Sequence, residues 1–278
     1  MTWNKLETGV REPALFFVKQ LLTLLNTHHP KTHQSLRRQP RDQAVIDRII
    51  DSNALVFNCF GDLLIQMRAL IIVDIQNDFL PRGALAVRQG DEVIPVINAL
   101  APRFELVVAT QDWHPRNHGS FAANYPGRKP GEMITLAGQP QVLWPVHCVQ
   151  GTKGAEISSL LDTSHIKAIF QKGVDPDIDS YSGIFDNERR RSTGLSEYLA
   201  KQDVKEIFIA GLALDYCVKF TALDAVSLGL NTWVIRDACR AVNLGPNDGE
   251  RAVGQMRSNG VRVVRSKEIA NLQYSTAR

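Results

Sequence analysis

Short apolar runs that recur along much of the chain constrain its fold more than any other sequence feature. The first of them, residues 69–73, reads Ala, Leu, Ile, Ile, Val and ends at Asp74. A continuous run of this kind is typical of a strand buried on both faces, as strands in parallel sheets are. The same pattern recurs at residues 106–109, 166–170, 207–210, 233–235 and 261–264.

Amphipathic segments separate most of these runs. In residues 216–228, for example, Val218, Ala222 and Ala225 fall on one face of a helix. Strands that alternate with helices predict a three-layer α/β/α domain with a mostly parallel six-stranded sheet. Ligands in such folds bind at the carboxyl ends of the strands, so those ends are where chemistry is expected. The other expected helices cover residues 91–101, 195–202 and 248–259.

The composition supports a folded protein and excludes several classes. Hydrophobic residues make up 44% and charged residues 22% of the 278 residues, which excludes a disordered chain. A net charge of +3 is too small to indicate nucleic-acid binding. Four cysteines do not make a disulfide framework, so a reducing, cytoplasmic location is expected. No apolar run reaches the ~18 residues that a membrane-spanning helix needs, and no membrane association is predicted.

The sequence changes character at Met67, which divides the chain into an extension, residues 1–66, and a domain, residues 67–278. We expect the extension to be poorly structured or helical and dispensable, as a stretch read upstream of a start at Met67 would be. Acidic residues near its beginning and the absence of a cleavage site argue against a signal peptide. Three arginines in the extension, Arg37, Arg38 and Arg41, are the slight support for a nucleic-acid role there.

Two charged residues follow predicted strands. Asp74 comes directly after the first apolar run, where desolvation raises the pKa of a carboxyl group and suits it to act as a general base. Lys172 follows the run at 166–170, and its ammonium can stabilise a thiolate or a developing oxyanion. The alternatives are a turn cap for Asp74 and a surface lysine for Lys172.

A cysteine lies where the strand at 207–210 passes into a helix. Cys217 falls in the first turn of that helix, with Asp215 as the expected N-cap. The helix dipole and unpaired N–H groups at such a position lower the pKa of a thiol and can hold an oxyanion. The alternative is a buried, unreactive cysteine, which fits Cys239 better.

Histidines and a carboxylate concentrate in two loops that also contain Trp and Pro. Asp112 and His114 are two residues apart, so in an extended segment their side chains point to the same side. His118 follows in the same loop, and His147 lies in the second. Imidazole and carboxylate ligands suit zinc, iron or manganese. Any one of these histidines could be an ordinary loop residue, but their concentration favours a metal site.

Seven motifs appear in one order along residues 67–269. Together they resemble the nicotinamidase branch of the isochorismatase-like cysteine hydrolase superfamily, in which the Asp-Trp-His and Trp-Pro-Val-His-Cys pair marks the metal-dependent members. The resemblance implies the isochorismatase-like hydrolase fold for nearly all of the domain. The motifs are VDIQNDF at 73–79, QDWHP at 111–115, NHGSF at 117–121, LWPVHCV at 143–149, KG at 172–173, DSYS at 179–182 and DYCV at 215–218.

The resemblance also implies roles for residues. It implies a catalytic triad of Asp74, Lys172 and Cys217, and a divalent metal, with zinc expected first and iron or manganese as alternatives. It further implies a cis peptide between Leu212 and Ala213, and the sequence departs from the family at Leu214, where relatives usually carry Thr. The implied metal ligands are Asp112, His114 and His147, with His118 a ligand in some members. The implied pyridine walls are Phe79, Trp144 and Tyr181, and the implied oxyanion hole is formed by the amides of Ala213 and Cys217.

The activity implied by the resemblance is hydrolysis of nicotinamide to nicotinate and ammonia, together with hydrolysis of pyrazinamide, in the recycling of nicotinamide into NAD. A monomer or small homo-oligomer is expected. The nearest alternatives are an isochorismatase, a carbamoyl amidohydrolase or a ureidoacrylate hydrolase, which typically lack the metal site. A non-catalytic binding protein on the same fold is the alternative of another class, and the presence of Asp74, Lys172 and Cys217 together argues against it.

Overall fold

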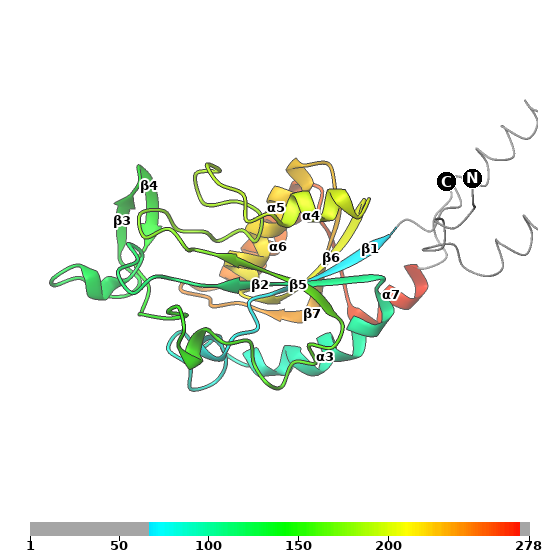
Figure 1. Cartoon of the computed structure of the whole chain (residues 1–278), viewed down its shortest axis with the longest axis horizontal. Coiled ribbons are helices and arrows are strands. Elements are labelled where there is room, and N and C mark those ends of the chain that lie inside the picture. The colour runs from blue at the N-terminus through cyan, green and yellow to red at the C-terminus, as the bar shows by residue number, and fades with distance from the viewer. Residues whose placement is uncertain (1–66, 273–278) are drawn as a thin grey trace, which may run out of the picture. The chain divides into compact units, whose positions relative to one another are not determined.

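The computed structural model describes residues 67–272, and the expected extension, residues 1–66, lies outside them. A six-stranded sheet forms the centre of this domain (Figure 1). Its strands lie in the order β5-β2-β1-β6-β7-β8, and every neighbouring pair is parallel. The strands are β1 (Arg68–Val73), β2 (Leu106–Asp112), β5 (Ile166–Lys172), β6 (Glu206–Leu212), β7 (Asn231–Arg240) and β8 (Arg262–Val264).

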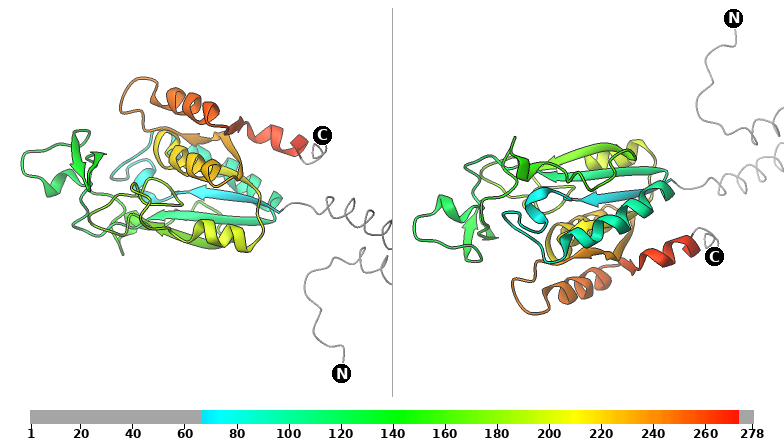
Figure 2. Two further views of the ribbon diagram at one scale, coloured as in Figure 1. Left: turned by 90° about the horizontal axis from the view of Figure 1, so that it is seen from above. Right: turned by 90° about the horizontal axis from the view of Figure 1, so that it is seen from below.

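The side chains of the central strand β1 are buried on both faces of the sheet, which gives the domain its three layers. They alternate between two apolar clusters, and from Ala69 to Val73 all are buried. Leu70 and Ile72 pack on the side of α3 (Val93–Leu100). Ile71 packs on the side of α4 (Leu195–Lys201), α5 (Lys219–Ser227) and α6 (Asp248–Ser258). Figures 1 and 2 show α3 and these three helices on opposite sides of the sheet. The predicted α/β/α fold with its six strands is therefore confirmed.

The helices agree with the expected segments except at two places, the turn that follows β6 and an additional helix after β8. The expected helix at 216–228 begins with a π-helical turn, Leu214–Val218, and continues as α5 (Lys219–Ser227). The remaining α-helices are α4 (Leu195–Lys201), α6 (Asp248–Ser258) and α7 (Ser266–Leu272), of which α7 was not expected. Short 3-10 turns cover Asn77–Phe79, Gly90–Glu92, Ala101–Arg103, Ala122–Asn124 and Lys153–Ala155.

A two-stranded antiparallel hairpin, β3 (Met133–Leu136) and β4 (Gln139–Val142), projects beside the sheet (Figure 1) and was not expected either. Both strands are short and largely exposed or half-buried, so neither contains the continuous apolar run that identifies the buried strands. In the part of the chain that the structure describes, no helix is both long and apolar enough to cross a bilayer.

The strand order places the candidate site. From β1 the chain proceeds outward through β2 to β5, then returns to the other side of β1 with β6 and continues to β7 and β8. Ligands in open α/β sheets bind where the strand order reverses, at the carboxyl ends of the strands. Here the strands at that point are β1 and β6, and the predicted residues Asp74, Asp112 and Lys172 end or directly follow β1, β2 and β5.

Candidate active site

The structure brings Asp74, Lys172 and Cys217 together at the carboxyl ends of the strands. Nζ of Lys172 lies 3.0 Å from Oδ2 of Asp74 and 3.3 Å from Sγ of Cys217. It also donates a hydrogen bond to the carbonyl oxygen of Ser180, at 3.0 Å. Asp74 and Lys172 are fully buried, and Cys217 is 7% exposed. A carboxylate, an ammonium and a thiol thus form one contact group, as a nucleophilic mechanism requires.

Asp74 is held in place by its backbone and by the neighbouring strand. It directly follows β1 with a φ of 50°, in the left-handed region that non-glycine residues seldom adopt. Its Oδ1 accepts a 2.6 Å hydrogen bond from the hydroxyl of Thr110 on β2. Its Oδ2 accepts no well-aligned hydrogen bond from any described residue. Oδ2 is therefore the oxygen left to accept a proton.

The pKa values in this group follow from burial and charge. Burial raises the pKa of Asp74 more than Lys172 and Thr110 lower it. Burial alone would lower the pKa of Lys172, but the carboxylates of Asp112 and Asp74 outweigh it and raise that pKa well above its usual range. Burial, aided by the same carboxylates, also raises the pKa of the Cys217 thiol well above its usual range. This corrects the sequence prediction that the helix terminus would lower it.

The turn that carries Cys217 agrees with the sequence predictions in its cis peptide bond but not in its N-cap residue. The peptide bond between Leu212 and Ala213 is cis, as the resemblance implies. Asp215 is not the N-cap, because Ala213 takes that position. The Asp215 carboxylate instead accepts hydrogen bonds from the amides of Val242 and Asn243, at 2.9 and 2.8 Å. It fastens the turn to the loop after β7, a contact that sequence spacing alone does not reveal.

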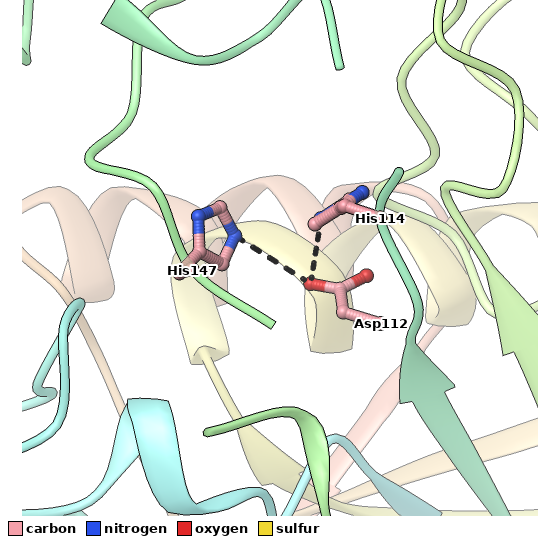
Figure 3. Close-up of side chains that lie close together, drawn as sticks. All are labelled: Asp112, His114 and His147. Carbon is pink, nitrogen blue, oxygen red and sulfur yellow. Dashed lines mark ion pairs between the residues drawn. The ribbon is translucent and has the colours of Figure 1, made fainter. Parts of the chain in front are cut away.

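A second cluster lies beside the first, formed by Asp112, His114 and His147 (Figure 3). Oδ2 of Asp112 lies 3.6 Å from Nε2 of His114 and 3.9 Å from Nε2 of His147. One potential ligand atom from each residue lies within 4.8 Å of the others, and all three residues are buried. Atoms at these separations can surround a single metal ion.

The hydrogen bonds around this cluster fit a metal. Nδ1 of His114 lies 2.8 Å from the carbonyl oxygen of Gly173, and Nδ1 of His147 lies 2.8 Å from that of Pro145. Since a carbonyl can only accept, each Nδ1 carries the proton and each Nε2 presents its lone pair. Gln76 holds the backbone of Asp112 on both sides, donating to its carbonyl and accepting from its amide, each at 2.8 Å.

His118 lies next to these ligands. Its ring centroid is 4.3 Å from that of His114, and its Nδ1 is 2.7 Å from the hydroxyl of Ser120. Its buried Nε2 has no hydrogen-bond partner among the described residues. Burial lowers the pKa of both His118 and His147 to about 4, so both are neutral at pH 7. For His114, the Asp112 carboxylate outweighs burial and raises the pKa. Nδ1 of His118 also accepts a 3.3 Å hydrogen bond from the amide of Ser120, so the neutral ring carries its proton on Nε2 and lies beside the proposed ligands.

A cavity of about 30 Å³ lies between the two clusters. Phe79, Trp144 and Tyr181, the three predicted pyridine walls, line it together with Ala213 and Cys217. The hydroxyl oxygen of Tyr181 accepts hydrogen bonds from Nε2 of Gln141, at 2.9 Å, and from Nε1 of Trp144, at 3.2 Å. The aromatic walls are thus fixed in position, which suits a flat ring.

Several lining residues were not identified from the sequence. Tyr216 lies next to Cys217 and could have been found from that motif, and Asp179 and Ser180 belong to the quoted 179–182 motif without an assigned role. Leu85 and Val242 also line the cavity, but no sequence signal points to either. Gln76 was quoted only within a motif, and nothing in the sequence shows that it fastens Asp112.

With the geometry described, comparison with known proteins is informative. A model of the isochorismatase domain matches residues 68–268. The chain belongs to the isochorismatase family. The nicotinamidase of Escherichia coli (strain K12) is 49% identical to this family member over 197 residues, covering 69% of this chain and 92% of that protein.

Solved structures of nicotinamidases and pyrazinamidases are also similar to this chain. That of an Acinetobacter baumanii nicotinamidase and pyrazinamidase has a TM-score of 0.72 at 46% identity, covering 73% of this chain and 98% of that one. That of the Pyrococcus horikoshii pyrazinamidase in complex with zinc has a TM-score of 0.59 at 39% identity, covering 71% and 98%. The predicted family and the predicted class of enzyme, an amide hydrolase, are confirmed.

Proposed function

We propose that this protein is a metal-dependent nicotinamidase that hydrolyses nicotinamide to nicotinate and ammonia, with Cys217 as the nucleophile. The observation that carries the proposal is the contact of the Lys172 ammonium with both Cys217 Sγ and Asp74 Oδ2, beside an aromatic-walled cavity. The 49% identity to a nicotinamidase supports the substrate.

The first half of the reaction forms a thioester. The thiol proton of Cys217 passes to Asp74 as the sulfur attacks the carboxamide carbon and the carbonyl electrons move to oxygen. A thiol with a raised pKa needs such a base, and a carboxylate with a raised pKa holds the proton more readily. Lys172 remains charged and stabilises the negative charge that moves between Asp74 and the sulfur.

The oxyanion then collapses. We assign its stabilisation to the backbone amides of Ala213 and Cys217, since both residues line the cavity at the turn after β6. The carbon–nitrogen bond breaks, and Asp74 returns its proton to the departing nitrogen, which leaves as ammonia.

The second half releases the acid. Water attacks the thioester carbon, Asp74 accepts a proton from that water, and the same proton returns to the sulfur of Cys217. The carbon–sulfur bond breaks, nicotinate leaves and the thiol is restored. One water is consumed per cycle, and its second proton leaves with the acid and is taken up by the released ammonia as ammonium, so atoms and charges balance.

Asp112, His114 and His147 would hold the metal, and His118 would lie beside them. Zinc fits a site of imidazole and carboxylate, and the solved structure of the pyrazinamidase relative is a complex with zinc. Iron or manganese fits the same donors. When bound, the metal supplies a Lewis acid that can hold and polarise a heteroatom of the substrate. The chain's own part is to present two Nε2 lone pairs and one carboxylate oxygen.

The cavity walls orient the substrate. Phe79, Trp144 and Tyr181 would confine the pyridine ring. The ring would lie between Cys217 and the group of Asp112, His114 and His147, which we call the histidine cluster. Holding the ring at both ends places the carboxamide carbon against the sulfur and lowers the entropic part of the barrier. Pyrazinamide has the same shape, and the similarity to a nicotinamidase and pyrazinamidase supports its hydrolysis. The nicotinate formed would enter NAD synthesis.

The deciding experiment is an ammonia-release assay on nicotinamide with metal-stripped and metal-reconstituted protein, zinc, iron and manganese being restored separately. Release that depends on the metal supports the proposal. An isochorismate or N-carbamoyl substrate should give no product, because hydrolases with those substrates typically lack the histidine cluster. Turnover of those substrates without turnover of nicotinamide would overturn it.

A further inference from the structure

A groove of arginine side chains lies outside the candidate active site, and the proposed reaction does not use it. Two cavities, of about 270 and 340 Å³, share the lining residues Arg236, Arg240 and Glu250. Arg88 lines the first cavity and Arg265 the second. We call the two cavities together the arginine groove.

The charge of the arginine groove is not balanced by its own residues. The four arginines that line it face two lining carboxylates, those of Glu250 and Asp237. Arg236 pairs with Glu250 at 2.9 Å, and Arg240 pairs with Glu92 at 2.8 Å. Neither Arg88 nor Arg265 forms an ion pair with another described residue. Two guanidinium groups therefore remain without a carboxylate partner.

The two paired arginines are partly buried, whereas the two unpaired ones, Arg88 and Arg265, are exposed. The side chains of Arg236 and Arg240 are 35% and 25% exposed, so part of each guanidinium is shielded from water. Partly desolvated charges attract an anion more strongly than fully solvated ones. Arg236 and Arg240 both come from β7, and Arg240 also donates to the carbonyl oxygens of Asp237 and Cys239. The residues shared by the two cavities are thus held by the strand, while Arg88 lines one cavity and Arg265 the other.

We propose that the arginine groove binds a phosphorylated small molecule that carries at least two negative charges. Guanidinium groups present paired N–H donors that match two oxygens of a phosphate, which makes arginine a preferred phosphate ligand. Two unpaired guanidinium groups, one in each cavity, suit two phosphate groups better than one. The amides of Gln89, Asn243 and Asn247 line the first cavity and supply further hydrogen bonds for an organic part.

The arginine groove also adjoins the candidate active site through one loop. Ala241 and Asn243 line the groove, whereas Val242 between them lines the candidate active-site cavity. The Asp215 carboxylate, two residues before Cys217, holds the amides of Val242 and Asn243. A ligand that contacts Asn243 therefore contacts the loop that contributes to the substrate cavity. The experiment below measures binding of the ligand itself, so its result does not depend on the proposed hydrolysis.

The test is isothermal titration calorimetry of the full chain with inorganic pyrophosphate and, separately, with ADP, at constant ionic strength. We expect saturable binding with one ligand per chain. In the double variant Arg88→Gln/Arg265→Gln, affinity should fall at least about tenfold, since each lost charge-assisted hydrogen bond is worth ~1.5–3 kcal/mol. Tighter binding of ADP assigns the groove to an organic phosphate, and equal binding assigns it to the diphosphate group alone.

A matched control separates a site from diffuse attraction. Arg103→Gln/Arg257→Gln removes the same charge from exposed positions that do not line the groove, and its affinity should equal that of the parent. Equal weakening in both double variants would mean non-specific attraction and would overturn the proposal. Unchanged affinity in Arg88→Gln/Arg265→Gln would place the anion elsewhere, for example at the histidine cluster, and would also overturn it. So would the absence of saturable binding at millimolar ligand.

Discussion

Lys172 donates a hydrogen bond to Oδ1 of Asp112 over 2.5 Å, and Asp112 presents its other oxygen to the histidine cluster. Burial alone would raise the pKa of Asp112, but the Lys172 ammonium and His114 outweigh it and hold that pKa far below its usual range. Asp112 is therefore ionised at neutral pH. The Asp112 carboxylate thus connects the proposed nucleophile group with the proposed metal ligands. A substitution in either group should therefore affect the other.

Replacing Cys217 by Ala should abolish nicotinamide hydrolysis and leave the fold intact. The loss should be at least about a thousandfold in kcat, because Cys217 carries the only thiol among the described residues that line the cavity. Removing one sulfur should change stability by no more than about 1 kcal/mol. Ammonia release and thermal unfolding measure the two effects. The control is Cys239→Ala, another buried cysteine that does not line the active-site cavity, which should keep its activity. Parent-like turnover in Cys217→Ala would refute the assignment.

Asp74→Asn should have opposite effects on turnover and on thiol labelling. Turnover should fall by about a hundredfold to ten-thousandfold, because the proton acceptor is lost. The Asp74 carboxylate raises the pKa of Cys217, so its removal lowers that pKa and increases the reactive thiolate at pH 7. Iodoacetamide should therefore label Cys217 faster in the variant, and in the parent the rate should rise with pH beyond neutrality. Slower labelling in Asp74→Asn, with Asp91→Asn as the exposed control, would contradict this electrostatic account.

The inner strands β1, β2 and β6 were predictable because burial on both faces requires continuous apolar runs, which a sequence shows directly. The edge strands β5 and β8 are partly exposed, but short apolar runs still identified them. The candidate site was predictable only in part. Its side chains end or follow strands, and parallel strands bring their carboxyl ends to one edge. The hairpin of β3 and β4 was missed since its residues are half exposed and carry no such run.

The electrostatics of Cys217 could not be obtained from local sequence. Its place in a helical turn suggests a lowered thiol pKa, but the structure buries the thiol and places near it the carboxylates of Asp74, after β1, and Asp112, at the end of β2. Those neighbours are distant in sequence, and their effect depends on ångström separations that spacing does not reveal. The same reason applies to Asp215, whose partners Val242 and Asn243 follow a later strand.

His147→Ala should lower metal content without unfolding the protein. Loss of one of the proposed ligands should weaken metal binding by at least about tenfold, because even partners one step removed from a metal have effects of that size. Elemental analysis of the purified protein and equilibrium titration with zinc provide the measurement. His165→Ala removes a histidine outside the cluster and should keep full metal content. Full stoichiometry in His147→Ala would mean that His147 is structural.

A chain that starts at Met67 should retain nicotinamide hydrolysis and metal binding. Every residue that the proposed mechanism uses lies between Asp74 and Cys217, and the family match begins at residue 68. We expect kcat/KM of the shortened chain to equal that of the full chain. The comparison requires both proteins, assayed for ammonia release and for melting temperature. A loss of activity or a large fall in melting temperature would show that residues 1–66 contribute to the domain.

Gly173→Ala should disturb His114 and through it the proposed metal site. Gly173 has a φ of 63°, and a Cβ at this position would lie 2.3 Å from the His114 ring, closer than van der Waals contact allows. The left-handed backbone costs an alanine roughly 1–2 kcal/mol, and displacing His114 also breaks its hydrogen bond to the Gly173 carbonyl. We expect a lower melting temperature together with reduced metal content. Gly254→Ala is the matched control: it lies within α6 with no atom within 4 Å of the added Cβ, and should stabilise the protein by up to about 1 kcal/mol. Full metal content in Gly173→Ala would show that His114 does not depend on this contact.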